Sequence, residues 1–220
     1  MCDVTAINKQ SPSGPPARRK RMPRAERERQ MIDVAVTTFA ERGYVATSMD
    51  DIAERVGVSK PMLYEYFHSK EGLLLAAIRE ARTALRQATE RAVTGATTGK
   101  EVLERGLLAY FRFMAERQDA WSLLRHELSF LGPVASEEVE AIRQQQTDFN
   151  MLLMRAHLTG ASDEEVEAAA EILVGACERM AVWYERHDHA TPELATQYTM
   201  NIIWNGMAFW QESDRGTPAG

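Results

Sequence analysis

Serine, lysine and tyrosine side chains gather in one short stretch, residues 59–70, where they could contact phosphate groups. Ser59 and Lys60 stand at the predicted start of a helix, and Tyr64 and Tyr66 follow within it. Hydroxyl and ammonium groups at the beginning of an exposed helix suit phosphate oxygens, which also attract the free backbone N–H groups found there. The predicted chemistry of this stretch is therefore binding to a phosphate backbone.

Two short helices joined by a tight turn must position these side chains. Ser48 followed by Asp51 has the spacing of a capping box, which predicts a helix that begins just after Ser48. Gly57 can take the left-handed conformation that ends this helix. Ser59 is a second N-cap, and Pro61 lies in the first turn, where its missing N–H costs little. The pair is either an ordinary helical hairpin with tyrosines at its surface or a helix-turn-helix, whose second helix enters the major groove of DNA.

The longer string from Thr47 to Leu74 favours the helix-turn-helix. It resembles the DNA-binding domain of the TetR family of bacterial transcriptional repressors, whose pattern is roughly T-[ST]-x-x-x-I-A-x-x-x-G-V-S-x-x-x-[LI]-Y-x-[YH]-F-x-[SN]-K-x-x-L, and every position is met. The match covers about the first third of the chain, and the rest has no comparable signature. The resemblance implies DNA contacts from Thr47, Ser48, Ser59, Lys60, Pro61, Met62, Tyr64, Tyr66 and Lys70.

Base recognition is expected from Pro61 and Met62, which occupy positions where family members commonly touch base edges. Neither side chain carries a hydrogen-bond donor. Apolar contact with thymine methyl groups, or recognition of DNA shape, should therefore carry more of the specificity. Arg55 and the basic N-terminal arm are candidates for the rest.

The charge of the chain is divided unevenly. Residues 1–70 hold 12 Lys and Arg against 9 Asp and Glu, a net charge of +3, whereas residues 71–220 hold 14 against 23, a net charge of −9. Basic charge at the end that carries the helix-turn-helix is the expected footprint of a nucleic-acid contact. Residues 1–23 include SPSGPP and four consecutive basic residues, 18–21, and predict a disordered basic arm. Such an arm is either a solubilising tail or follows phosphates and the minor groove.

The 220 residues predict an all-α protein with two domains. Residues 24–70 form the three-helix DNA-binding domain, and residues 71–220 form a larger helical domain for ligand binding and dimerisation, with helices over about 70–91, 101–117, 121–131, 136–158, 162–184 and 191–210. No apolar run reaches the roughly 20 residues that span a bilayer, and the first residues lack a signal core, so a cytoplasmic protein without membrane contact is expected. Cys2 and Cys177 form no disulfide framework.

The middle helices are rich in aromatic residues and methionine. Most of these are expected to be plain core, but the composition also suits an apolar pocket with a few polar anchors. The family uses this domain to bind a small inducer, so the resemblance implies an unidentified small apolar effector. The candidate pocket residues are Tyr110, Phe111, Met114, Trp121, Arg125, His126, Phe130, Phe149 and Trp183. Further candidate anchors are Glu127, Gln145, Asn150 and Arg155.

The last two predicted helices stay apolar over more than one face, which indicates burial on two sides. In the family these helices pair with those of a second subunit as a four-helix bundle, and the resemblance implies a homodimer here. The expected interface residues are Ala169, Leu173, Ala176, Met180, Ile202, Gly206 and Phe209. Two symmetric subunits would read an operator that is an inverted repeat.

The function predicted from these features is that of a ligand-responsive DNA-binding transcriptional regulator, most simply a repressor that a small apolar effector releases from a palindromic operator. The alternative is a constitutive or activating regulator without a ligand. A helical metal-dependent enzyme is a remote alternative, because the Glu-x-x-His pairs of a di-metal site are absent and His187 and His189 would not share a helix face. No G-x-S-x-G, phosphate-binding glycine loop or H-E-x-x-H occurs, and no catalytic residue, metal or cofactor is predicted.

Overall fold

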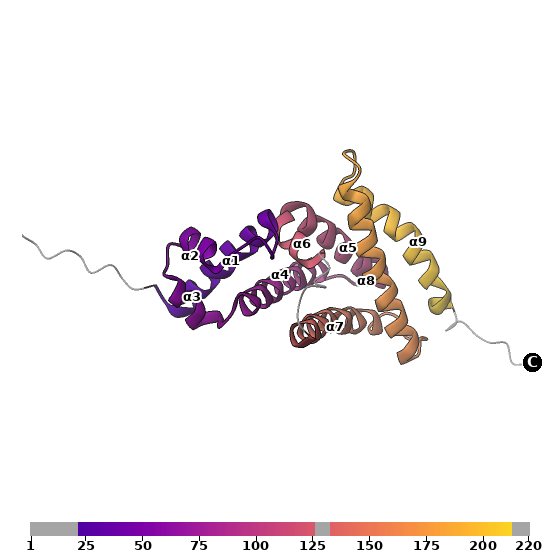
Figure 1. The fold of residues 1–220 in the computed structure, drawn as a ribbon. Helices are drawn as coiled ribbons and strands as arrows, with labels where there is room; N and C mark the ends of the chain where they lie inside the picture. The colour runs from indigo at the N-terminus through magenta and orange to yellow at the C-terminus, as the bar shows by residue number, and fades with distance from the viewer. Residues whose placement is uncertain (1–21, 126–132, 213–220) are drawn as a thin grey trace, which may run out of the picture.

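The protein is all-α, as the sequence predicts. The computed structural model describes residues 22–125 and 133–212, which form nine helices and no strand (Figure 1). Most of the predicted basic arm and the predicted helix continuation to residue 131 lie outside the described residues. The helices are α1 (Arg24–Arg42), α2 (Met49–Val56), α3 (Lys60–Phe67), α4 (Lys70–Val93), α5 (Gly99–Glu116), α6 (Gln118–Arg125), α7 (Pro133–Arg155), α8 (Asp163–Glu185) and α9 (Pro192–Glu212).

Local signals set the boundaries of the helix-turn-helix formed by α2 and α3. The Ser48 hydroxyl accepts a hydrogen bond from the Asp51 N–H at 3.1 Å, and the Asp51 carboxylate accepts one from the Ser48 N–H at 2.8 Å, which completes the predicted capping box. Gly57 ends α2 with φ 79° and ψ 36°, a left-handed conformation that glycine adopts without a Cβ clash. Ser59 occupies the N-cap position of α3, but its hydroxyl makes no capping bond.

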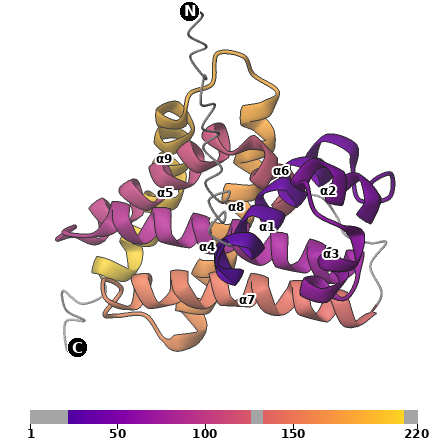
Figure 2. The same ribbon diagram turned by 90° about the vertical axis from the view of Figure 1, so that its left-hand side faces the viewer.

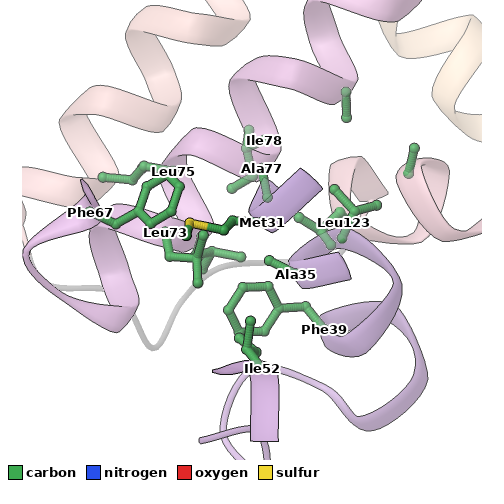
Figure 3. Packing of buried hydrophobic residues seen from close by; sticks show 14 of the residues in the cluster. Met31, Ala35, Phe39, Ile52, Phe67, Leu73, Leu75, Ala77, Ile78 and Leu123 are labelled. Carbon is green, nitrogen blue, oxygen red and sulfur yellow. The ribbon is translucent and has the colours of Figure 1, made fainter. Parts of the chain in front are cut away.

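Helices α1 to α3 and the first half of α4 share one apolar core with parts of α5, α6 and α7. Figure 3 shows Met31 of α1 beside Phe67 of α3 and Leu73 of α4, and Phe39 of α1 next to Ile52 of α2. Leu123 of α6 lies on the side of Ala35. We call this core the head cluster. It consists of Met31, Ala35, Val36, Phe39, Met49, Ile52, Ala53, Val56, Leu63, Phe67, Leu73, Leu74, Leu75, Ala77, Ile78, Ala81, Leu85, Phe113, Ala120, Leu123, Ala135 and Ile142.

A second core, the body cluster, lies between α5, α7, α8 and α9. It consists of Leu103, Leu107, Phe111, Met114, Trp121, Met154, Leu158, Val166, Ala169, Ala170, Cys177, Ala181, Ala195 and Met200. Helix α4 packs against α5 and α7, and α8 packs against both α7 and α9. Helices α8 and α9 lie together at the end of the molecule away from α2 and α3 (Figures 1 and 2).

Several boundaries differ from the predicted ones, among them the start of α6 at Gln118 rather than 121 and the end of α7 at Arg155 rather than 158. Helix α7 begins at Pro133 rather than near Ser136, since proline is tolerated in a first turn, where its N–H would have no partner. Helix α4 continues to Val93, and Gly95 follows in the loop with φ 75°. Within the described ranges, no helix combines the length and apolar character needed to cross a membrane.

Candidate nucleic-acid interface and internal cavity

The first turn of α3 presents its side chains to solvent. Ser59, Lys60, Pro61, Met62 and Tyr64 are all exposed, whereas Leu63 and Phe67 on the other face belong to the head cluster. The split follows from helical spacing, because the two buried residues are four apart. The exposed set combines a free hydroxyl at the N-cap, one ammonium group and an apolar patch, which suits contact with a phosphate backbone beside a groove.

Lys60 already has an anionic partner on the neighbouring helix. Its ammonium group donates to the Asp50 carboxylate at 2.7 Å, and this hydrogen bond raises the pKa of Lys60. Both side chains are exposed, so the pair contributes little to stability. A phosphate group can therefore replace Asp50 as the partner of Lys60 at small cost.

Thr47 has a different role from the predicted one. Its side chain is only 2% exposed, and its hydroxyl donates to the carbonyl oxygen of Gly43 at 2.8 Å. The side chain thus closes the loop between α1 and α2 and is shielded from any phosphate. The structure contradicts a DNA contact from this hydroxyl.

Tyr66 contacts the start of α1, and Lys70 contacts the loop between α1 and α2. The Arg24 guanidinium lies 4.7 Å from the centre of the half-buried Tyr66 ring. The Lys70 ammonium lies 4.2 Å from the Tyr44 ring centre, and partial burial lowers its pKa. Both remain candidate DNA contacts, as does Ser48.

Arg55 has partners on the neighbouring helix α1. Its guanidinium donates to the Glu41 carboxylate at 2.6 Å and to the Thr38 hydroxyl at 3.2 Å. The side chain therefore ties α2 back to α1, although it is exposed. Its contribution to base recognition stays a prediction.

A cavity of about 70 Å³ lies between α4, α5, α6, α7 and α8. Of the predicted pocket residues, Tyr110 and Trp121 line it, and their rings meet edge to face with centroids 5.6 Å apart. The predicted anchor Asn150 also lines it. The complete lining is Arg82, Leu85, Thr89, Leu103, Gly106, Leu107, Tyr110, Trp121, Gln146, Asn150, Leu173, Val174, Cys177 and Glu178.

Several predicted pocket residues lie elsewhere. Phe111 and Met114 are fully packed in the body cluster, because they point from α5 in other directions than Tyr110. Phe149 lines a separate surface hollow between α4 and α7, together with the predicted anchor Gln145. Trp183 stacks on His187 at 4.6 Å beside the α8–α9 turn. These four predicted residues therefore do not line this cavity.

Other predicted anchors are either occupied or outside the described part. Arg155 forms an ion pair with Asp163 at the start of α8. The side chain of Arg125 and residues 126–132, which include His126, Glu127 and Phe130, lie outside the described residues.

Arg82 is among the cavity residues that sequence reasoning missed. Arg82 lies on α4 between Ile78 and Leu85. From the sequence alone it would be interpreted as a solvent-exposed arginine beside the apolar stripe. Its Nε atom is buried without a hydrogen-bond partner, and so is the hydroxyl of Tyr110. The spacing of Arg82 within the stripe was the only sequence signal of burial. That signal is weak, because an arginine at the edge of an amphipathic helix usually reaches water.

The outward face of α8 and α9 is apolar. Ile172 is 62% exposed, Tyr198 44% and Ile202 75%, and Gly206 is exposed nearby. A Cβ atom added at Gly206 would meet no atom of this chain within 4 Å. This face is a candidate contact surface for another molecule.

Two predicted interface residues point inward instead. Ala169 is 5% exposed in the body cluster, and Leu173 lines the cavity. Ile172, one position before Leu173, is the exposed residue at this point of α8. Ala176 and Met180 are partly buried, and the side chain of Phe209 lies outside the described residues.

The described residues contain no group of three or more His, Cys, Asp or Glu side chains that could hold a metal ion. The His187 Nδ1 atom lies 2.7 Å from the Trp183 carbonyl oxygen, so this imidazole is engaged within its own chain. Burial raises the pKa of the Cys177 thiol to about 12, so it stays protonated and unreactive at neutral pH.

Two family models match the chain. Residues 31–77 match the bacterial regulatory proteins of the tetR family, and residues 96–207 match the tetracyclin repressor-like C-terminal domain. The HTH-type transcriptional activator FasR of Mycolicibacterium smegmatis is 28% identical over 203 residues, which cover 90% of each chain. The HTH-type transcriptional repressor KstR2 of Rhodococcus jostii is 26% identical over 188 residues, 83% of this chain and 91% of that protein.

A solved structure of a TetR-like transcriptional regulator from Rhodococcus sp. RHA1 has the same fold. It superposes with a TM-score of 0.67 at 30% sequence identity and covers 86% of this chain and 99% of that one. The likeness spans the DNA-binding part and the helical body together.

Proposed function

Because the chain belongs to the TetR family and is a DNA-binding transcriptional regulator, we propose that it binds an inverted-repeat operator as a homodimer and leaves it when a small, largely apolar effector fills the cavity. The exposed first turn of α3 carries the DNA part of this proposal. No catalytic role is proposed, since the matched family consists of regulators.

Helix α4 supports the coupling of effector and operator. Its first half, with Leu73 and Ala77, packs in the head cluster beneath α1 and α3, and its second half, with Arg82 and Thr89, lines the cavity. An effector changes DNA affinity only if it binds one arrangement of α4 better than the other. Because α4 touches both sites, a shift in the position of this one helix would link the cavity to the helix-turn-helix.

A dimer is supported by the apolar face of α8 and α9. Ile172 and Ile202 would both become buried if this face met its own copy across a two-fold axis. The α3 helices of the two subunits would then be related by the same axis, which is the geometry that reads an inverted repeat.

Repression is the simpler outcome of this design, because a dimer on its operator excludes other proteins from that DNA. The similarity to FasR, an activator, favours the second candidate, in which the bound dimer also promotes transcription. Transcription from a promoter that contains the selected operator, measured with and without the purified protein, decides between them. Less transcript with the protein supports a repressor, and more transcript supports an activator.

Binding-site selection from random duplexes followed by salt-dependent titration tests the DNA proposal. We expect an inverted repeat, and we expect Lys60→Ala to weaken operator binding about tenfold or more, since each subunit loses a charged phosphate contact. The slope of log affinity against log salt should fall by about one per lost contact.

Lys100→Ala is the matched control, because Lys100 is an exposed lysine on α5, away from the helix-turn-helix. Its affinity and salt slope should equal those of the wild type. A selected site without dyad symmetry, or equal affinities for the Lys60→Ala and Lys100→Ala proteins, would count against the proposed interface.

A further inference from the structure

Two buried polar groups point to the chemistry of the effector. The Nε–H of Arg82 and the hydroxyl of Tyr110 both line the cavity, and neither has a hydrogen-bond partner among the described residues. Buried donors are nearly always paired, because an unpaired one loses its hydrogen bonds to water without compensation. A bound molecule that accepts from both donors would restore these bonds.

The charges around the cavity leave Arg82 uncompensated. Glu178 lies nearby, but its carboxylate is paired with Arg143 at 3.3 Å, and no ion pair is present for Arg82 within the described ranges. Burial lowers the pKa of Arg82, partly offset by Glu178, yet a guanidinium stays protonated at neutral pH. Arg82 is therefore a charged guanidinium at the cavity wall that forms no ion pair with the described residues.

The other titratable groups beside the two donors are Tyr110, Cys177 and Glu185. Burial raises the pKa of Tyr110 well above its usual value, so the phenol stays neutral and can donate. Cys177 is a neutral thiol. The Glu185 carboxylate accepts from the Trp121 indole N–H at 3.0 Å. Two donors without partners, one of them on a guanidinium, are complementary to the two oxygens of one carboxylate.

The other end of the space is apolar. Leu103, Asn150 and Leu173 lie between the cavity and a neighbouring hollow of about 60 Å³ and line both. Beyond them the walls are mainly aliphatic and aromatic, with Val102, Leu153, Met154, Leu158 and Trp204. A chain that leaves the polar end between α5 and α7 would lie against these residues.

We propose that the effector is a carboxylic acid with an apolar chain, whose carboxylate accepts hydrogen bonds from Arg82 Nε and the Tyr110 hydroxyl and whose chain extends toward Trp204. This inference rests on the proposed effector function of the cavity and names the ligand class for it. A carboxylate suits the site because its two oxygens can accept from two donors while its single charge balances one guanidinium.

The position of Arg82 on α4 would let a bound carboxylate affect the DNA-binding end of the protein. Arg82 lies within α4, one residue from Ala81 of the head cluster. Drawing its guanidinium toward a carboxylate between α5 and α7 would pull on the helix that supports α1 and α3. The acid thus binds one arrangement of α4 preferentially, which is the requirement for release.

Calorimetric titration with decanoate, decanol and methyl decanoate tests the inference, because the three probes share a chain length and differ in the head group. We expect the wild-type protein to bind decanoate about tenfold or more tightly than either neutral probe. Arg82→Met should reduce this preference to about onefold while leaving decanol binding nearly unchanged. Arg86→Met is the matched control, since Arg86 is an exposed residue of α4 paired with Glu90, and it should keep the preference.

Tyr110→Phe provides a second variant whose folding is not at risk. The lost hydroxyl has no partner in the free protein, so the melting temperature without ligand should be unchanged or higher, whereas decanoate affinity should fall severalfold. Equal binding of the acid and the alcohol, a preference that survives Arg82→Met, or no binding of decanoate would overturn the inference. Operator release is measured in the same samples, so that a failure of this inference can be told from a failure of the proposed function. If decanol releases the operator and the acid is not preferred, the carboxylic-acid inference is wrong but the proposed response to an apolar ligand stands.

Discussion

Ile202→Arg is expected to convert the protein into a monomer at micromolar concentration and to abolish operator binding, although α3 is untouched. Ile202 is 75% exposed on α9, close to the exposed Gly206. If this face meets its own copy, the substitution buries two unpaired arginines per dimer, which costs several kcal/mol. A monomer contacts only one half-site, so the affinity for the full operator is lost with the dimer. Sedimentation velocity and operator titration of the same preparation measure both effects.

Leu152→Arg is the matched control for this result. Leu152 is 69% exposed on α7, so the same charge is added to an exposed leucine outside the proposed interface. That protein should remain a dimer and bind DNA as the wild type does. A wild-type protein that sediments as a monomer, or an Ile202→Arg protein that still dimerises, would move the interface away from α8 and α9.

Leu123→Ala is expected to lower the free energy of unfolding by about 2–5 kcal/mol, the usual cost of removing a buried leucine side chain. Leu123 lies on α6, far along the chain from the helix-turn-helix, yet it is buried in the head cluster beside Ala35 (Figure 3). The loss should therefore weaken the packing of α1 as well as α6. Urea unfolding, followed by tryptophan fluorescence and circular dichroism, measures the change.

Leu152→Ala should leave the unfolding free energy within about 0.5 kcal/mol of the wild type, because Leu152 is largely exposed. The two probes should report one transition if the head and the body unfold together. Two separate transitions, with only one of them moved by Leu123→Ala, would show that the head and the body unfold independently.

Local sequence signals were enough to predict the helix-turn-helix. The capping box at Ser48, the left-handed glycine at Gly57 and the proline in the first turn of α3 each depend on a few neighbouring residues. The buried pair Leu63 and Phe67 follows from helical spacing alone. These features need no knowledge of the remaining chain.

Features that depend on which helix packs against which could not be predicted in the same way. Adjacent residues of one helix face different neighbours, so Tyr110 reaches the cavity while Phe111 is core, and Ile172 is outward while Leu173 lines the cavity. Arg82 was missed because burial of a charged side chain is set by the approach of α7 and α8. The spacing of apolar residues indicates a helix face but not its partner.

The head cluster also limits how such a protein can acquire a new operator. A chimera made by joining another relative's first 70 residues to this body would place foreign α1 side chains against α6, which carries Ala120 and Leu123 of the head cluster and belongs to the recipient. Mismatched volumes there leave cavities or force overpacking. Recombination at that junction would therefore yield poorly folded hybrids, and new DNA specificity should arise by point substitution in the exposed first turn of α3, where no packing has to be matched.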